Sequence, residues 1–177
     1  TVSGYTAISD ENIKLNGDNI AFNGTVNAGS IDVTAVGTTT FNNAVDVSSG
    51  SVDDLKFSAA GTVILNSDLT GNVVTTGNNQ GILTTTGLNK TITGNIGSST
   101  SLDLNTLNIG SDTDATNYST TTINGNVFAN STVLNNNGTT NSSELILASG
   151  KNITSTITTA DANMGILTLA GGTQTVT

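Results

Sequence analysis

One stretch decides the fold: Leu65-Asn66-Ser67-Asp68-Leu69-Thr70-Gly71-Asn72-Val73, which returns almost intact as Leu88-Asn89-Lys90-Thr91-Ile92-Thr93-Gly94-Asn95-Ile96. The two copies are offset by 23 residues, from position 65 to position 88. Leu, Asn, Gly and the closing β-branched residue keep their order, whereas the positions between them change freely. Such a pattern is typical of a structural repeat. We therefore read the chain as a stack of similar units.

Earlier echoes of the same pattern extend the repeat toward the start of the chain. Phe22-Asn23-Gly24-Thr25-Val26 reappears as Phe41-Asn42-Asn43-Ala44-Val45, so a large apolar residue followed by Asn recurs at spacings of 19, 24 and 23 residues. These intervals are typical of one turn of a parallel β-helix, and their variability favours the right-handed, loop-tolerant form. We predict an all-β fold, a right-handed parallel β-helix (β-solenoid) of roughly eight coils of 19–24 residues.

This alignment predicts two stacked rows of side chains. The large apolar residues form a predicted core column of Phe22, Phe41, Leu65, Leu88, Leu147 and Leu169. The residues that follow the first four form a predicted ladder of Asn23, Asn42, Asn66 and Asn89. An Asn at such a corner can adopt the left-handed backbone conformation, and stacked amides can hydrogen-bond along the rod.

Composition supports a strand-rich scaffold and excludes several classes of partner. Thr and Asn make up roughly a third of the 177 residues, a content that suits strands and turns, and Pro, Cys, Trp and His are absent. The net charge is −9, with four Lys and no Arg. This charge argues against nucleic-acid partners and anionic membranes, and no apolar run reaches the length of a membrane span. We expect one solenoid segment over 1–177, part of a longer chain, that does not insert into a membrane.

Three patterns suggest chemistry. Asp112, Asp114 and Asn117 resemble the start of an oxygen-rich calcium loop, although the glycine and distal Glu of a complete loop are missing, so calcium is a weak candidate and no other cofactor is expected. The acidic pairs Asp53-Asp54 and Asp10-Glu11 are the carboxylates that a polysaccharide-cleaving enzyme would use, but acids in solvated turns explain them better.

The Thr triplets raise an ice-binding alternative. Runs of three Thr occur at 38–40, 84–86 and 120–122, but their intervals are irregular, whereas an ice-binding face would place Thr at the same point of every coil. We therefore interpret them as β-forming residues on a solvated sheet.

Three phrases resemble the passenger regions of rickettsial-type surface-antigen autotransporters, the outer-membrane protein A and B group. They are Thr91-Ile92-Thr93-Gly94-Asn95-Ile96-Gly97, Leu104-Asn105-Thr106-Leu107-Asn108-Ile109-Gly110 and Gly165-Ile166-Leu167-Thr168-Leu169-Ala170-Gly171-Gly172. The resemblance covers about residues 65–177 and implies a β-helical passenger exposed on an outer membrane, where it coats the cell and aids host attachment. It implies no catalytic residues.

These observations lead to a functional expectation. The chain is expected to be a non-enzymatic, extracellular β-solenoid of a bacterial cell surface, a rigid spacer and coat with host-attachment loops near 110–120 and 135–143. Expected partners are further copies of itself, through open solenoid ends, and a host-cell surface protein or glycan. The alternative is a self-assembling subunit of an extracellular filament or surface layer.

Overall fold

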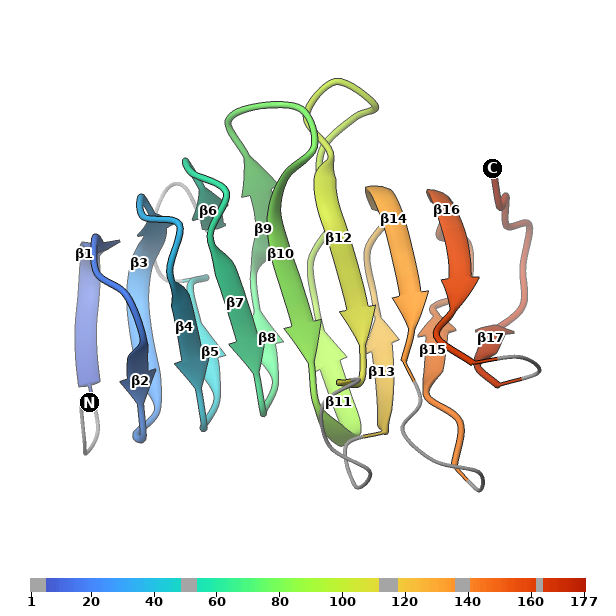
Figure 1. Ribbon diagram of the computed structural model, residues 1–177, viewed down its shortest axis with the longest axis horizontal. Helices are drawn as coiled ribbons and strands as arrows, with labels where there is room; N and C mark the ends of the chain where they lie inside the picture. The colour runs from blue at the N-terminus through green and yellow to red at the C-terminus, as the bar shows by residue number, and fades with distance from the viewer. Residues whose placement is uncertain (1–5, 49–53, 112–117, 136–140, 162–163) are drawn as a thin grey trace.

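The computed structural model describes residues 6–48, 54–111, 118–135, 141–161 and 164–177, and every regular element within these ranges is a β-strand (Figure 1). The strands are β1 (Thr6–Leu15), β2 (Ile20–Phe22), β3 (Val26–Val33), β4 (Thr38–Phe41), β5 (Val45–Asp46), β6 (Asp54–Phe57), β7 (Thr62–Leu65), β8 (Leu69–Thr70), β9 (Asn72–Thr75), β10 (Gln80–Thr85), β11 (Gly87–Ile92), β12 (Leu104–Ile109), β13 (Ser119–Ile123), β14 (Val127–Leu134), β15 (Glu144–Leu147), β16 (Ile153–Thr159) and β17 (Ile166–Leu169).

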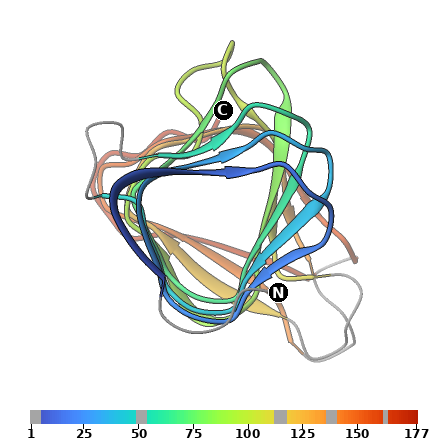
Figure 2. The same ribbon diagram turned by 90° about the vertical axis from the view of Figure 1, so that its left-hand side faces the viewer.

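The strands form two sheets in which every pairing between named strands is parallel. One sheet has the order β17-β15-β13-β11-β8-β5-β3-β6-β9, with β1 also paired to β3, and the other has the order β16-β14-β12-β10-β7-β4-β2. The chain visits the two sheets in turn and advances along the long axis of the molecule (Figure 1). Viewed along that axis, successive passes of the chain lie behind one another around a common outline (Figure 2). We call each pass a coil. The predicted all-β fold with parallel strands is therefore confirmed.

The first sheet bends at β3, which gives each pass a third straight side. Val26 and Asn27 of β3 pair with β5, whereas Ser30–Val33 pair with β6. We call the stretch that starts at Ser30–Val33, β6 and β9 the third side. It continues toward the C-terminus through single parallel bridges that join Val73 to Ile96, Ile96 to Val127, and Ile153 to Val176, and β14 pairs with β16 between Val127 and Ile153.

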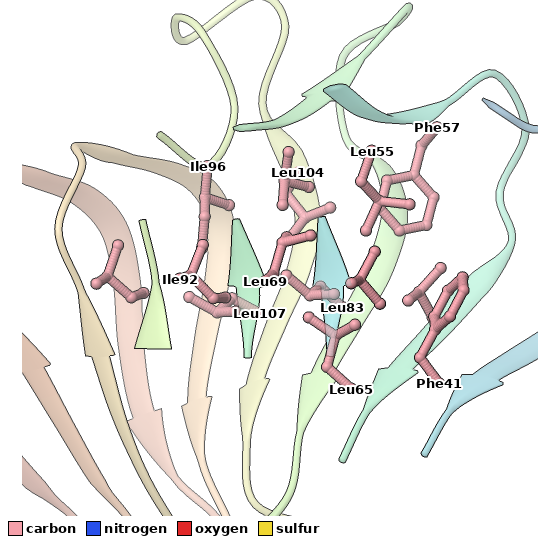
Figure 3. Close-up of a cluster of buried hydrophobic side chains, with 14 of the residues drawn as sticks. Phe41, Leu55, Phe57, Leu65, Leu69, Leu83, Ile92, Ile96, Leu104 and Leu107 are labelled. Atoms are coloured by element: carbon pink, nitrogen blue, oxygen red, sulfur yellow. The ribbon is translucent and has the colours of Figure 1, made fainter. Parts of the chain in front are cut away.

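The period-two pattern of the strands explains the core. In β4, β6 and β7 alternate residues are buried, so one set of side chains points inward and the other faces solvent. The buried apolar residues of all three sides form one cluster, and Figure 3 shows part of it. Phe22 and Phe41 stack with their ring centroids 4.9 Å apart. Burial of these side chains is the main driving force for folding in a chain without disulfides.

The predicted core column is correct for its first three members and wrong for Leu88. Phe22 pairs with Phe41, and Phe41 pairs with Leu65, but Leu65 pairs with Thr85. Leu88 lies in β11 and is 47% exposed. The connection between the two sheets is longer in this coil, so Leu88 falls in the extra residues.

The remaining predicted members of the column, Leu147 and Leu169, lie in the other sheet. They continue a row that consists of Val26, Val45, Leu69, Ile92 and Ile123. The 23-residue offset that suggested the fold is therefore real, but it joins Leu69 to Ile92 and Val73 to Ile96.

Thr is not confined to the solvated surface, as the sequence had suggested. Thr39, Thr85 and Thr121 are buried, since the middle residue of each Thr run points inward. Thr85 Oγ1 lies 2.7 Å from Thr121 Oγ1, and Ser119 Oγ lies 2.9 Å from the same atom. Buried hydroxyls are tolerated when they bond to one another, as these do. The expectation of Thr on a solvated sheet is wrong at these positions.

Stacked glycines allow the coils to approach closely where the chain enters the third side. A Cβ on Gly94 would lie 2.3 Å from the carbonyl oxygen of Gly71, and one on Gly125 would lie 2.2 Å from that of Gly94. The repeated glycine of the original motif is therefore required because the backbone of one coil occupies the space of a side chain on the next.

Candidate functional site: a polar wall on the third side

The predicted ladder of asparagines forms in its first three members. Asn42 Nδ2 donates to Asn23 Oδ1 at 2.7 Å, and Asn66 Nδ2 donates to Asn42 Oδ1 at 2.7 Å. Thr86 Oγ1 then donates to Asn66 Oδ1 in place of the predicted Asn89. Asn89 lies in β11 outside this row, for the reason that displaces Leu88.

The left-handed backbone conformation predicted for the four asparagines is confirmed at Asn89 and wrong at the other three. Asn89 has a φ of 55°, whereas Asn23, Asn42 and Asn66 do not have positive φ. The ladder asparagines therefore keep extended or right-handed backbone, and their contribution is side-chain hydrogen bonding.

Other sequence-based candidates lie wholly or partly outside the described residues. Asp112, Asp114 and Asn117, the calcium candidates, fall there, as does Asp53. The same is true of most of the loops predicted near 110–120 and 135–143. Asp54 is described and begins β6. Among the described residues no group of three or more His, Cys, Asp or Glu side chains is placed to hold a metal ion.

A second and longer polar ladder runs along the outside of the third side. We call it the polar column, and its members are Asn12, Ser30, Asp54, Asn72, Asn95, Asn126, Asn152 and Thr175. Ser30 Oγ donates to Asn12 Oδ1 at 2.6 Å. From Asn72 onward the bonds change character, because each side-chain oxygen accepts from the backbone of the next coil.

The backbone bonds of the polar column repeat with little variation. Asn72 Oδ1 accepts from the N–H of Asn95 at 3.0 Å, and Asn95 Oδ1 accepts from that of Asn126 at 2.8 Å. Asn126 Oδ1 accepts from the N–H of Asn152 at 2.9 Å, and Asn152 Oδ1 accepts from that of Thr175 at 2.8 Å. Each bond joins one coil to the next, so the column fixes the register of the third side.

In Asn95 and Asn126 these bonds engage only the oxygen of the amide. Within the described part of the chain, the Nδ2 groups of Asn95 and Asn126 donate no hydrogen bond to another protein atom. Asn95 is exposed and Asn126 is half-buried. Since the oxygen of each amide is held on the next coil, the two Nδ2 groups form a short row of neutral donors that faces solvent.

A parallel row, two residues further along each coil, changes from charged to apolar. We call it the flank column, and its members are Lys14, Asp32, Lys56, Val74, Gly97, Phe128 and Thr154. Lys56 Nζ lies 3.2 Å from Asp32 Oδ2 in a surface ion pair. From Val74 onward none of the named members of the flank column is charged. Val74 and Phe128 are therefore two apolar side chains next to the polar column.

Gly97 opens a cleft between these two side chains. A side chain cannot occupy this position, because Gly97 has a φ of +67° and a Cβ there would lie 2.3 Å from the carbonyl oxygen of Phe128. The result is a surface cleft of about 430 Å³. It is lined by Asn72, Val74, Asn95, Gly97, Ser98, Asn126 and Phe128.

Phe128 also borders a second cleft of about 250 Å³, whose lining includes Asp103 and Asn130. The loops at 76–79 and 97–103 project next to each other at the top of the view (Figure 1). They are tied together because the N–H of Asn79 donates to Asp103 Oδ1 at 2.7 Å. The loop at 97–103 is closed by a bond from Ser98 N to the carbonyl of Leu102 at 3.1 Å. The clefts therefore lie on the third side, next to a loop whose conformation is fixed by hydrogen bonds.

Sequence reasoning missed the polar column, although its signal was present. The sequence repeats Gly, Asn and a β-branched residue at 71–73, 94–96 and 125–127. Those three positions are the close approach, the side-chain ladder and the inward core residue. The cleft at Gly97 could not be found in this way, since it depends on which side chains flank that glycine in neighbouring coils.

Comparison with protein families, with curated proteins and with solved structures finds no match to this chain. A separate search of the described residues finds no helix with the length and apolar character that crossing a membrane requires.

Proposed function

We propose that the chain is a right-handed parallel β-helix of roughly eight coils and serves as a rigid, non-enzymatic scaffold on a bacterial cell surface. The observation that carries the proposal is the continuity of parallel pairing from β1 to β17 around one apolar core. A rod of this kind resists bending because each coil is joined to its neighbours by backbone bonds on several sides. Such a scaffold holds adhesive loops away from the cell envelope.

The surface chemistry supports binding rather than catalysis. The side chains that line the two clefts are amides, hydroxyls and apolar groups, and Asp103 is the one side-chain carboxylate among them. Such groups hold a neutral ligand, whereas acid–base catalysis needs titratable groups placed together. The excess of acidic residues keeps neighbouring rods apart. The likeness of three phrases to autotransporter passenger regions supports the extracellular location.

An adhesion assay tests this function. Beads coated with the purified chain should be retained on cultured animal cells more than beads coated with serum albumin. A variant with substitutions only among outward Thr residues of β4, β7 and β13 should retain this binding. Equal retention of chain-coated and albumin-coated beads would argue against the adhesive role.

A second candidate, a self-assembling subunit, is favoured by the apolar surface at one end of the stack. Ile166 and Leu169 of β17 and the nearby Val176 are 47%, 44% and 46% exposed. Among the described strands β17 pairs only with β15, so its other edge can accept a further strand. Electron microscopy of the purified chain distinguishes the two, since ordered filaments that lengthen with concentration are expected only of the self-assembling subunit.

A further inference from the structure

We propose that the cleft over Gly97 binds a neutral N-acetylated hexosamine unit of a glycan. This inference rests on the adhesive part of the proposed function, because it names the class of ligand to which the surface would adhere. The argument concerns the cleft of about 430 Å³ between Val74 and Phe128, a size within the range of small-molecule sites.

The polar groups of the cleft select the ligand's hydrogen-bonding atom. Asn95 and Asn126 offer Nδ2 donors, while their oxygens are held on the backbone of the next coil. Asn72 Nδ2 is directed to Asp54 Oδ1, at 3.5 Å. A row of donors is best satisfied by a group that only accepts, such as an amide carbonyl. The acetamido carbonyl of an N-acetylated sugar is such a group.

The apolar groups select the rest of the unit. Val74 and Phe128 are separated by two coil steps, about 9.6 Å, with only the backbone of Gly97 between them. A sugar ring can lay its apolar face on the ring of Phe128, and the acetamido methyl group then packs toward Val74. Ser98 supplies a hydroxyl that can pair with a sugar hydroxyl at the loop side of the cleft.

Charge and placement favour a neutral glycan. The protein has a net charge of −9, and neither Lys nor any other cation lines the cleft, so an acidic sugar would find no counter-charge. The second cleft continues on the other side of Phe128, with Asn130 and Asp103 in its lining. A linear oligosaccharide can therefore cross Phe128 and place a neighbouring unit there.

The ligand pair that tests the proposal is tri-N-acetylchitotriose and cellotriose. The two have the same ring and linkage, and they differ by an acetamido group in place of a hydroxyl. Isothermal titration with the full chain should give a dissociation constant on the order of 1 mM or tighter for the N-acetylated trisaccharide. Cellotriose should bind about tenfold more weakly or worse.

Isosteric variants locate the binding. Asn95→Asp and Asn126→Asp keep the oxygen that accepts the backbone bond, and they replace the Nδ2 donor by a carboxylate oxygen that repels a carbonyl. Each should weaken the binding of tri-N-acetylchitotriose about tenfold or more. Asn152→Asp is the matched control, because Asn152 has the same ladder bond but lines neither cleft.

The outcomes separate clearly. Binding that is lost in Asn95→Asp and Asn126→Asp but kept in Asn152→Asp, with unchanged thermal unfolding in all three, supports the proposal. The proposal is overturned if tri-N-acetylchitotriose does not bind, if cellotriose binds equally well, or if Asn152→Asp weakens the binding of tri-N-acetylchitotriose as much as the other two variants do. Failure of this kind leaves the proposed function standing, because bead retention tests the adhesive role and distances along the rod test the scaffold.

Discussion

Replacing Gly94 by Ala should disrupt the stacking of coils at one defined point. The added Cβ would lie 2.3 Å from the carbonyl oxygen of Gly71, which is backbone and cannot rotate away. Ordinary contacts of this kind begin at 3.4 Å, so the two coils must separate by about 1 Å at this position.

The cost follows from two terms. Overpacking against a rigid neighbour costs about 1–3 kcal/mol. The separation also weakens backbone bonds that flank the site, such as Val73 N to the carbonyl of Asn95 at 2.8 Å and Thr93 N to that of Leu69 at 3.0 Å. Each such bond contributes about 0.5–1.5 kcal/mol. Gly94→Ala should therefore lower the free energy of unfolding by about 3–5 kcal/mol.

Gly77→Ala is the matched control, since the nearest atom to its added Cβ is Gln80 Oε1 at 3.4 Å and its φ is not positive. It should change stability by no more than about 1 kcal/mol, through the lower entropy of the unfolded chain. Urea unfolding followed by circular dichroism measures both variants. If Gly94→Ala proves within about 1 kcal/mol of Gly77→Ala, the stacking of Gly94 on Gly71 is wrong.

Three further predictions test the side-chain rows. Leu65→Ala should destabilise the protein by about 2–5 kcal/mol and Leu88→Ala by well under 1 kcal/mol in the same urea assay; similar losses would restore Leu88 to the core. Asn42→Ala breaks two inter-coil bonds and should cost about 1–2 kcal/mol, whereas Asn89→Gly should be neutral by thermal unfolding; an equal loss at Asn89 would contradict its exclusion from the ladder. Thr85→Val should cost about 1 kcal/mol by calorimetry, because it removes the buried hydrogen bond between Thr85 Oγ1 and Thr121 Oγ1, and a stabilised variant would refute that role.

Much of the fold could be predicted because strands in a stack repeat their inward residues. Phe22, Phe41 and Leu65 occupy equivalent positions and are all large and apolar, so their spacing indicated the parallel pairing. The prediction failed at Leu88 because the chain takes a longer path between the sheets in that coil. A sequence repeat fixes the register only between the two copies that share it, here at Leu69 and Ile92.

The candidate site was harder to predict, since it depends on neighbours in different coils. A glycine followed by Asn is a common turn pattern, and nothing local to Asn95 indicates that its oxygen is held by Asn126. The cleft likewise requires Gly97 to lie between Val74 and Phe128, which are distant from each other in the sequence. The burial of Thr85 could not be predicted because Thr suits both faces of a strand, and it follows from the pairing of Thr85 with Leu65.

The most direct test of the stacked-coil scaffold is a distance along the flank column. Lys14 and Thr154 lie at its two ends, six coil steps apart, and the chain has no Cys, so spin labels attach only where Cys is introduced. At about 4.8 Å per step, double electron–electron resonance between labels at Lys14→Cys and Thr154→Cys should give one narrow distribution centred near 29 Å. A broad distribution, or a mean beyond about 40 Å, would contradict the stack and with it the proposed rigid scaffold.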